Sequence, residues 1–467
     1  MLKPRADAVY FLDLQVQNVR CFAELVRLDL SDGQGQPRQW NVLLGDNGTG
    51  KTTLLQCLAL IARRPLQDVP IFDARWEELG WSKPTGWGQG WDEVDPVYSS
   101  LPRTGRLVPK SNPLLWTSRI EAKLVGCNAS NEIVMPRHRM DFEYDPKSGV
   151  TKGNSNYDDI RDGLTQVYGY GAARHLGPST LQADERDDAT TSLFSPDAGL
   201  LDANEWLLRL DYFAKSDPEG PFPVQRDRVI EVLVRLLPEV QGIRIRPPTR
   251  EVSQARRDLE SLVMFETCDG EVPLRGLSLG YQAMLAWVVD FAARMFERYP
   301  DSPDPLAEPA IVLVDELDLH LHPSWQRSII EHLTNTFPST QFVVTAHSPL
   351  VVQAAEDANI ALLRRDGDHV VVDNDPGVVR GWRVDQVLTS DLFGLPSGRP
   401  PSIAKLLDER SELLARGIST DAERERLAEL DALLDGLPAA ESRRDRETLE
   451  ELRQVAALVR EHLEGGS

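Results

Sequence analysis

Hydrophobic residues in this chain alternate with polar ones in some segments and form continuous runs in others, and the two patterns predict strands in different settings. Alternation over residues 9–30 predicts two antiparallel strands that meet near Arg20, and alternation over 118–144 predicts a meander. Continuous apolar runs are typical of strands that are buried on both faces of a central sheet. Such runs lie at 40–44, 308–314 and 341–345, and shorter predicted strands lie at 164–173, 242–246 and 262–267.

Apolar residues at three- and four-residue spacing predict helices. These lie at 54–61, 201–214, 224–237 and 284–296, and beyond Pro401 at 403–414, 422–434 and 443–463. We therefore expect a head at residues 1–400, with a helical lobe at 195–300, and a separate helical tail at 401–467, folded as a hairpin or a bundle. Between residues 63 and 113 the periodicity fails and Gly, Pro and Trp accumulate, which predicts an insertion. Its four tryptophans either pack onto the domain, which we favour, or form a partner-binding patch.

Composition narrows the class of protein. The 467 residues are 41% hydrophobic and 27% charged, which is typical of a globular protein with room for two or three domains. The longest apolar stretch, 283–296, contains Asp290 and Arg294 and is too short and too charged to span a bilayer. Four scattered cysteines indicate free thiols, and the first residues lack the apolar segment of a signal peptide, so we expect a cytoplasmic protein without a membrane partner. A formal net charge of −22 argues against a surface coated with nucleic acid but allows DNA in a local basic groove.

A glycine-rich turn follows the first apolar run directly and opens the first predicted helix. It fits the phosphate-binding spelling G-x-x-x-x-G-K-[ST]. Its residues are Gly45, Asp46, Asn47, Gly48, Thr49, Gly50, Lys51, Thr52 and Thr53. Glycines let backbone N–H groups surround a triphosphate, and the helix N-terminus adds partial positive charge. Lys51 is expected to reach the β- and γ-phosphates and the Thr52 hydroxyl to ligate Mg²⁺, so the sequence predicts a nucleotide site rather than a simple capped turn.

Acidic residues and a histidine follow the two other apolar runs. Asp315 and Glu316 end the second run, where Asp315 is expected to hold Mg²⁺ and Glu316 to polarise a water for attack on the γ-phosphate. His347 follows the third run, at the same end of the sheet if the strands are parallel, where it can sense the γ-phosphate or hold the attacking water. Without the phosphate loop the two acids would only end a strand at the surface; together with it they favour a hydrolytic site.

Further along the chain, Ser278 is placed to cap the long helix that contains Gly280, and a capped helix N-terminus is an anion site. At this point the chain resembles the ABC ATPase superfamily, because the phosphate loop, a signature-like Ser278-Leu279-Gly280, the two acids, Asp318 and His347 occur in that family's order. The resemblance is closest to the SMC/RecF/OLD-like branch. It implies an α/β fold, in which an ABC-type P-loop ATPase head has a mixed central sheet with flanking helices and an antiparallel β lobe, with a helical insertion and a C-terminal helical region.

The resemblance also implies ATP and Mg²⁺ as cofactors and a homodimer or higher homo-oligomer. In this family two heads face one another, so Ser278 and Gly280 would act on the ATP of a second copy and Asp318 would lie at the seam. Arg20 looks like part of the branch's arginine loop and would help to bind the nucleotide. Leu279 stands where the family's signature has a glycine, and Gln166 is the candidate, on sequence position alone, for the glutamine that follows the family's first lobe.

Two further features have alternative interpretations. His320 and His322 alternate and could suggest a metal site, but we favour a structural role. The densest basic segment can contact the phosphates of DNA or tRNA, or can be balanced by nearby acids, which we favour. Its residues are Arg244, Arg246, Arg250, Arg256 and Arg257, and the nearby acids are Glu251, Asp258 and Glu260.

Three stretches, 168–174, 205–212 and 385–395, are similar to stand-alone ATPases of bacterial anti-phage defence systems, Septu-like and retron-associated. Because no nuclease motif is evident here, we expect an effector on another chain, such as an HNH-type nuclease. The resemblance thus implies an ATPase that forms ATP-sandwiched dimers and controls this effector. The alternatives are a RecF/SMC-like DNA repair or recombination ATPase that binds DNA, and a scaffold that binds ATP without turnover, against which Glu316 and His347 argue.

Overall fold

The computed structural model describes the chain in segments. These are residues 2, 8–62, 116–127, 133–145, 150–157, 166–174, 189–237, 240–246, 262–377, 380–417 and 420–435. The predicted insertion at 63–113, the predicted helix at 443–463 and three of the five arginines of the basic segment lie outside the described residues. The chain divides into two compact units, Met1–Phe393 and Gly394–Ser467.

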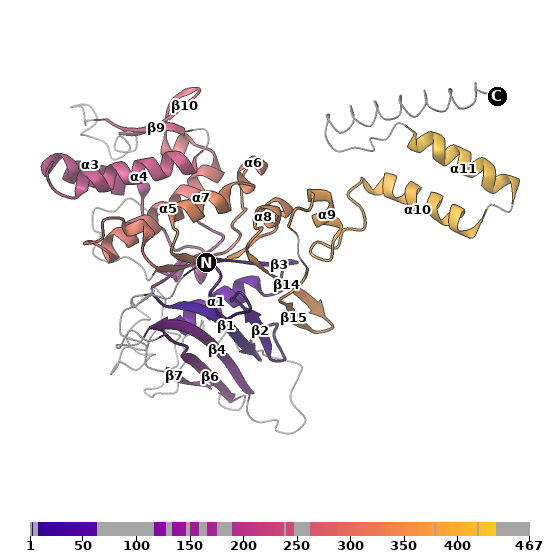
Figure 1. Ribbon diagram of the computed structural model, residues 1–467, viewed down its shortest axis with the longest axis horizontal. Coiled ribbons are helices and arrows are strands. Elements are labelled where there is room, and N and C mark those ends of the chain that lie inside the picture. Colours follow the sequence, from indigo (N-terminus) through magenta and orange to yellow (C-terminus); the bar gives the residue numbers. More distant parts are fainter. Residues whose placement is uncertain are drawn as a thin grey trace. The chain divides into compact units, whose positions relative to one another are not determined.

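A mostly parallel sheet of six strands forms the centre of the first unit (Figure 1). Its order is β15 (His369–Asp373), β14 (Asn359–Asp366), β3 (Trp40–Gly45), β13 (Thr340–Thr345), β12 (Ala310–Val314) and β8 (Val167–Tyr170). β15 pairs antiparallel with β14, and all other neighbours are parallel. The three continuous apolar runs are therefore confirmed as adjacent strands of a central sheet.

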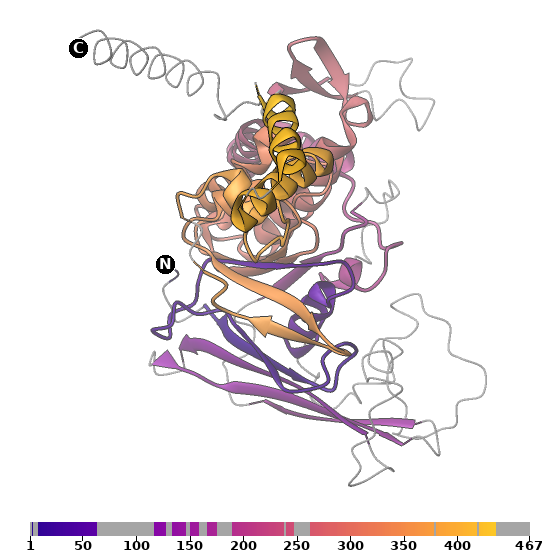
Figure 2. The ribbon, with the colours of Figure 1, turned by 90° about the vertical axis from the view of Figure 1, so that its right-hand side faces the viewer.

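Both faces of this sheet are covered, which explains the continuous apolar runs. In β12, Val312 and Val314 join the core on one face, whereas Ile311 and Leu313 join the core on the other. The first core includes residues of α3 (Ala203–Ser216), α4 (Phe222–Leu236), α5 (Leu279–Arg298) and α7 (Ile329–Thr336). The second includes α1 (Lys51–Ala62) and an antiparallel sheet, and Figure 2 shows these layers on opposite sides of the central sheet.

The antiparallel sheet contains the strands predicted from alternation. Its order is β2 (Val26–Asp29), β1 (Tyr10–Gln17), β4 (Trp116–Cys127), β6 (Arg137–Asp145) and β7 (Val150–Tyr157), with β5 (Ile133–Val134) beside β4. The side chain of Gln341 in β13 is fully buried and hydrogen-bonds both backbone groups of Phe11 in β1, at 2.9 and 2.8 Å. This amide therefore connects the two sheets through the core.

The lobe at 195–300 contains a small sheet as well as helices. β9 (Val240–Ile245), β10 (Val263–Thr267) and β11 (Gly270–Pro273) form antiparallel pairs, of which the sequence predicted the first two strands. Asp290 of α5 is 2% exposed and accepts hydrogen bonds from the Tyr170 hydroxyl at 3.0 Å and from Arg294 Nε at 2.7 Å. A buried charge requires such partners, and here they connect α5 to the end of β8.

Short helices complete the first unit: α6 (Pro323–Gln326), α8 (Pro349–Ala354) and α9 (Val384–Thr389). In the second unit, α10 (Pro401–Arg416) and α11 (Asp421–Leu434) pair through Arg410–Asp431 at 2.6 Å and Arg426–Glu409 at 2.8 Å. Two of the predicted tail helices are thus confirmed. Among the described residues, no helix has the length and apolar character needed to cross a membrane.

Candidate nucleotide-binding site

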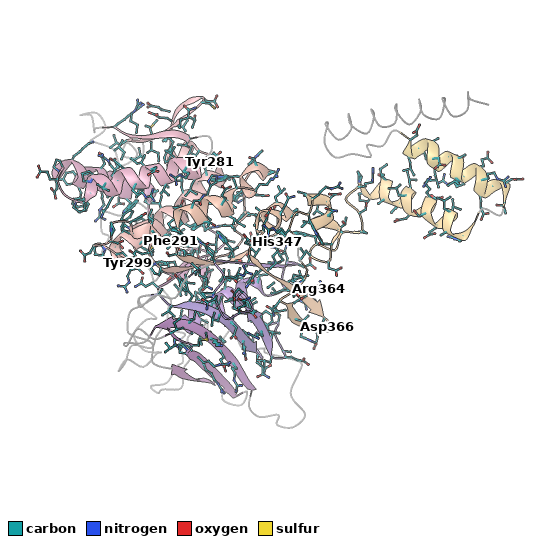
Figure 3. All side chains as sticks on the ribbon, viewed as in Figure 1. Tyr281, Phe291, Tyr299, His347, Arg364 and Asp366 are labelled. Atoms are coloured by element: carbon teal, nitrogen blue, oxygen red, sulfur yellow. The ribbon has the colours of Figure 1, made fainter. Side chains whose placement is uncertain are left out.

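The carboxyl ends of four parallel strands meet at one edge of the central sheet. There β3 continues into the phosphate loop, β12 into Asp315 and Glu316, β13 into His347, and β8 into residues 171–174. In Figure 3, His347 lies at this edge of the sheet, and Tyr299 lies at the opposite edge. The Tyr299 hydroxyl donates to the carbonyl oxygen of Pro309, just before β12 begins. The parallel arrangement on which the placement of His347 depended is therefore confirmed.

Glycines give the phosphate loop its shape. Gly45 has φ 141° and Gly50 has φ 89°, conformations that L side chains rarely adopt. A Cβ on Gly45 would lie 2.5 Å from the carbonyl oxygen of Leu363, and one on Gly50 would lie 2.4 Å from Cys21 Sγ. The backbone of the loop is therefore packed closely against β14 on one side and against the turn after β1 on the other, while Asp46, Asn47 and Gly48 are exposed.

Lys51 is 6% exposed and points back into the loop. Its Nζ donates to the carbonyl oxygens of Gly45 at 2.7 Å and of Asp46 at 3.0 Å. Burial lowers the pKa of Lys51, and the nearby carboxylates of Asp315 and Glu316 partly offset that effect. The ammonium group thus lies within the loop where phosphates would bind, held by carbonyl groups that it can exchange for phosphate oxygens.

Thr52 and Asp315 are brought together from positions 263 residues apart. The Thr52 hydroxyl donates to Asp315 Oδ2 at 2.7 Å, and Thr345 at the end of β13 donates to Asp315 Oδ1 at 2.7 Å. A hydroxyl and a carboxylate oxygen are hard donors of the kind that Mg²⁺ prefers, and Mg²⁺ usually takes only one or two such protein ligands beside phosphates. The pair fits the predicted magnesium site, and Thr345, which sequence reasoning missed, orients its carboxylate.

Glu316 adopts a left-handed backbone conformation, with φ 50°. Its N–H donates to Thr345 Oγ1 at 2.6 Å, and its carbonyl oxygen accepts from Arg174 Nη2 at 2.5 Å. Arg174 is 7% exposed, and burial lowers its pKa to about 10 against the attraction of Asp315 and the neighbouring carboxylates. In the sequence, Arg174 is the last residue of the stretch 168–174, and no motif there predicts a role for it in the site.

Asp318 and His347 are also in contact within one chain. The backbone N–H of His347 donates to Oδ2 and Oδ1 of Asp318, at 3.0 and 3.2 Å. The His347 side chain is exposed at the edge of the sheet, next to α8. The carboxylate of Asp318 thus fixes the backbone from which the imidazole projects.

The signature-like segment begins α5. Ser278 is confirmed as the N-cap, because its side chain accepts from the Tyr281 N–H at 3.4 Å. Leu279 is 69% exposed. Gly280 packs against the loop after Glu316, and a Cβ there would lie 2.2 Å from the carbonyl oxygen of His320.

Arg20 lies beside the first turns of α1, where its Nη1 donates to Gln56 Oε1 at 2.8 Å and to Thr53 Oγ1 at 3.3 Å. The expectation that Gln166 is the glutamine of the nucleotide site is wrong. Gln166 precedes β8, at the edge opposite the phosphate loop, because β8 runs parallel to β12. The residue that reaches the site from this strand is Arg174, beyond its other end.

One of the two alternating histidines and the described arginines of the basic segment make local contacts. His322 caps α6 by accepting from the Ser324 N–H at 3.3 Å, and no group of three potential metal ligands gathers among the described residues. Arg244 pairs with Glu266 and Glu271, and Arg246 pairs with Glu271. The described part of the basic segment is therefore balanced by acids, although not by those expected from the sequence.

Two protein families match the chain. Residues 141–353 match the family described as "AAA domain, putative AbiEii toxin, Type IV TA system", and residues 13–64 match a second one described as "AAA domain". The second match contains the phosphate loop, and the first contains both acids and His347.

Curated relatives and a solved structure are also similar. "Retron Ec83 probable ATPase" of Escherichia coli is 39% identical over 140 residues, which are 30% of this chain and 25% of that protein. "Septu protein PtuA" of Bacillus mycoides (strain KBAB4) is 24% identical over 421 residues, which are 89% of this chain and 49% of that protein. This chain thus spans about half the length, or less, of the curated relatives it matches. The crystal structure of an SMC head bound to the C-winged helix domain of ScpA is 15% identical, with a TM-score of 0.43 over 78% of this chain and 97% of that one.

The family matches and the curated relatives agree with the resemblance inferred from the motifs. The chain is similar to the probable ATPases of retrons and to the PtuA protein of Septu systems.

Proposed function

We propose that this chain binds Mg·ATP at the edge of its central sheet and hydrolyses it to ADP and phosphate. The observation that carries the proposal is one hydrogen-bonded set of side chains beside the phosphate loop. Thr52 and Thr345 both donate to Asp315, and Thr345 also accepts from the backbone of Glu316. A nucleotide site without hydrolysis would not need a second acid, next to the metal-binding one, whose backbone is held by hydrogen bonds on both sides.

Each side chain has a separate task in this proposal. Thr52 and Asp315 would hold Mg²⁺, which when bound neutralises charge on the β- and γ-phosphates. Lys51 exchanges its bonds to loop carbonyls for bonds to phosphate oxygens. The Glu316 carboxylate accepts a proton from the attacking water, and the His347 imidazole contacts the γ-phosphate.

We further propose that two copies pair around ATP and that this pairing controls a nuclease effector in anti-phage defence. In support, Ser278 and Leu279 are exposed at the N-terminus of α5, where a second copy can reach them. The names of the retron and Septu relatives also support a role in such systems. Nothing in the described part of the basic segment favours DNA over a protein partner, because its arginines are paired with acids.

A nucleotide-retention experiment tests the proposal. Wild-type protein, Glu316→Gln and Lys51→Ala are incubated with Mg·ATP, freed of unbound nucleotide by gel filtration, and assayed for mass and for bound ATP and ADP. We expect Glu316→Gln to retain unhydrolysed ATP at about twice the chain mass of 52.2 kDa, and Lys51→Ala to retain none. ADP in the Glu316→Gln sample would overturn the role of Glu316, and a single-chain mass with ATP bound would overturn the pairing.

A further inference from the structure

Arg174 is a buried cation close to Asp315, Glu316 and Asp318, the acids at the carboxyl ends of the parallel strands. The proposed reaction steps do not use it. It lies four residues beyond Tyr170, whose hydroxyl bond to Asp290 fixes the end of β8 against α5. Its Nη2 donates to the backbone carbonyl of Glu316, while its Nε is buried without a hydrogen-bond partner among the described residues. Arginine is costly to bury, so a position like this requires a compensating interaction.

The compensation comes from the carboxylates around it. The charges of Asp315, Glu316 and Asp318 all favour the protonated guanidinium. Among the described residues, Lys51 is a second cation near these acids, and its ammonium group is hydrogen-bonded within the phosphate loop. Arg174 therefore remains charged at neutral pH and reduces the repulsion among three acids that lie close together.

The hydrogen bond from Arg174 is made to Glu316, whose backbone conformation is strained. Glu316 is in the left-handed region, which a non-glycine residue adopts only when its surroundings hold it there. Thr345 holds the N–H of Glu316, and Arg174 holds its carbonyl oxygen. Releasing the carbonyl would let the peptide relax toward the right-handed region and would change the direction in which the Glu316 side chain leaves the backbone.

We infer that Arg174 is a positioning residue for the hydrolytic step, which holds the backbone of Glu316 so that its carboxylate faces the attacking water. This inference rests on the proposed ATP hydrolysis. It assigns to Arg174 an effect on the rate of the chemical step and not on the binding of the nucleotide. A residue that only supported the fold would instead lower stability, and one that contacted phosphate would weaken ATP binding.

The test compares Arg174→Ala, Arg174→Gln and Arg174→Lys with wild type, in steady-state hydrolysis and in equilibrium binding of a fluorescent ATP analogue. We expect Arg174→Ala to lower kcat about 10- to 100-fold, the range for losing one charge-assisted hydrogen bond, with nucleotide affinity changed by less than about threefold. Arg174→Lys keeps the charge and some donor capacity, so it should retain more activity than Arg174→Gln. Arg226→Ala is the control, because it removes an ion-paired arginine on α4, away from the site, and should leave kcat unchanged.

A double variant separates positioning from other roles. If Arg174 acts through Glu316, adding Arg174→Ala to Glu316→Gln should lower the residual rate no further than Glu316→Gln alone. A further, multiplicative loss in the double variant, or a matching loss of nucleotide affinity, would overturn the inference. Wild-type activity in Arg174→Ala would overturn it too, whereas a wild-type chain that does not hydrolyse ATP would overturn the proposed function instead. Melting curves of all variants give the fraction of folded protein, and each rate is normalised to that fraction.

Discussion

The contact between Asp318 and the backbone of His347 leads to a prediction that the sequence alone would not make. In the SMC/RecF-like resemblance, Asp318 lies at the seam between two heads. In this structure its carboxylate accepts the N–H of His347 of the same chain, at 3.0 and 3.2 Å. Asp318→Ala should therefore lower kcat by releasing the segment that carries the imidazole, even before any effect on pairing.

The magnitude follows from the geometry. A hydrogen bond to a charged group contributes about 1.5–3 kcal/mol, and about 1.4 kcal/mol corresponds to a tenfold change in rate. Because a single N–H is shared between the two oxygens of Asp318, only one such bond is lost. We expect kcat to fall about 10- to 100-fold in Asp318→Ala. The fall should be smaller in Asp318→Asn, which keeps one acceptor oxygen.

The assay is steady-state phosphate release at saturating ATP for both Asp318 variants and for His347→Ala. Solution mass is measured in the presence of Mg·ATP in parallel. We expect Asp318→Ala to lose activity under conditions where its solution mass with Mg·ATP equals that of wild type. Full activity in Asp318→Ala beside an impaired His347→Ala would refute it, as would a loss that appears only together with a loss of pairing.

Three other positions give predictions. Thr345→Val keeps the shape of a fully buried side chain but removes the hydroxyl that donates to Asp315, so the Mg²⁺ concentration needed for half-maximal hydrolysis should rise about tenfold; an unchanged Mg²⁺ titration would contradict this. Gly280→Ala places a Cβ 2.2 Å from the His320 carbonyl oxygen, and the backbone shift that this forces should lower the free energy of unfolding by about 1–3 kcal/mol. An unchanged melting temperature would contradict this close packing. Burial raises the pKa of the Cys57 thiol to about 12, so the folded state keeps a proton that the unfolded chain releases above about pH 9. Between pH 9 and 12 the unfolding free energy of wild type should therefore fall more steeply than that of Cys57→Ala, by about 1.4 kcal/mol per pH unit, and equal slopes would contradict the burial.

The sequence predicts those parts of the site that are local in the chain. The strand, turn and helix around the phosphate loop lie within 23 residues, and their apolar run and glycines are sufficient to identify them. The acids after β12 and His347 after β13 are recognised because each ends a continuous apolar run. The sequence predicts that these residues lie close together only if the strands are parallel. The pairings of β12 with β13 and of β13 with β3 are parallel.

Residues that join the site through strand order could not be found in this way. The Arg174 side chain reaches the backbone carbonyl of Glu316 because β8 pairs with β12, although the two residues are 142 positions apart in sequence. Thr345 reads in the sequence as an ordinary strand residue, and its role depends on the two atoms that its hydroxyl meets. Gln166 lies at the edge of the sheet opposite the phosphate loop. Its position in the sequence, next to a predicted strand, does not reveal which end of that strand is at the nucleotide site.

Phosphate release from ATP by the purified chain, with Mg²⁺ and at equal concentrations of wild type and Glu316→Gln, distinguishes ATP hydrolysis at this site from ATP binding alone. We expect sustained turnover by wild type and a loss of about two orders of magnitude or more in Glu316→Gln, within the range expected when a positioned general base is removed. Equal rates in the two proteins, or no release by a wild-type chain that binds Mg·ATP, would contradict it.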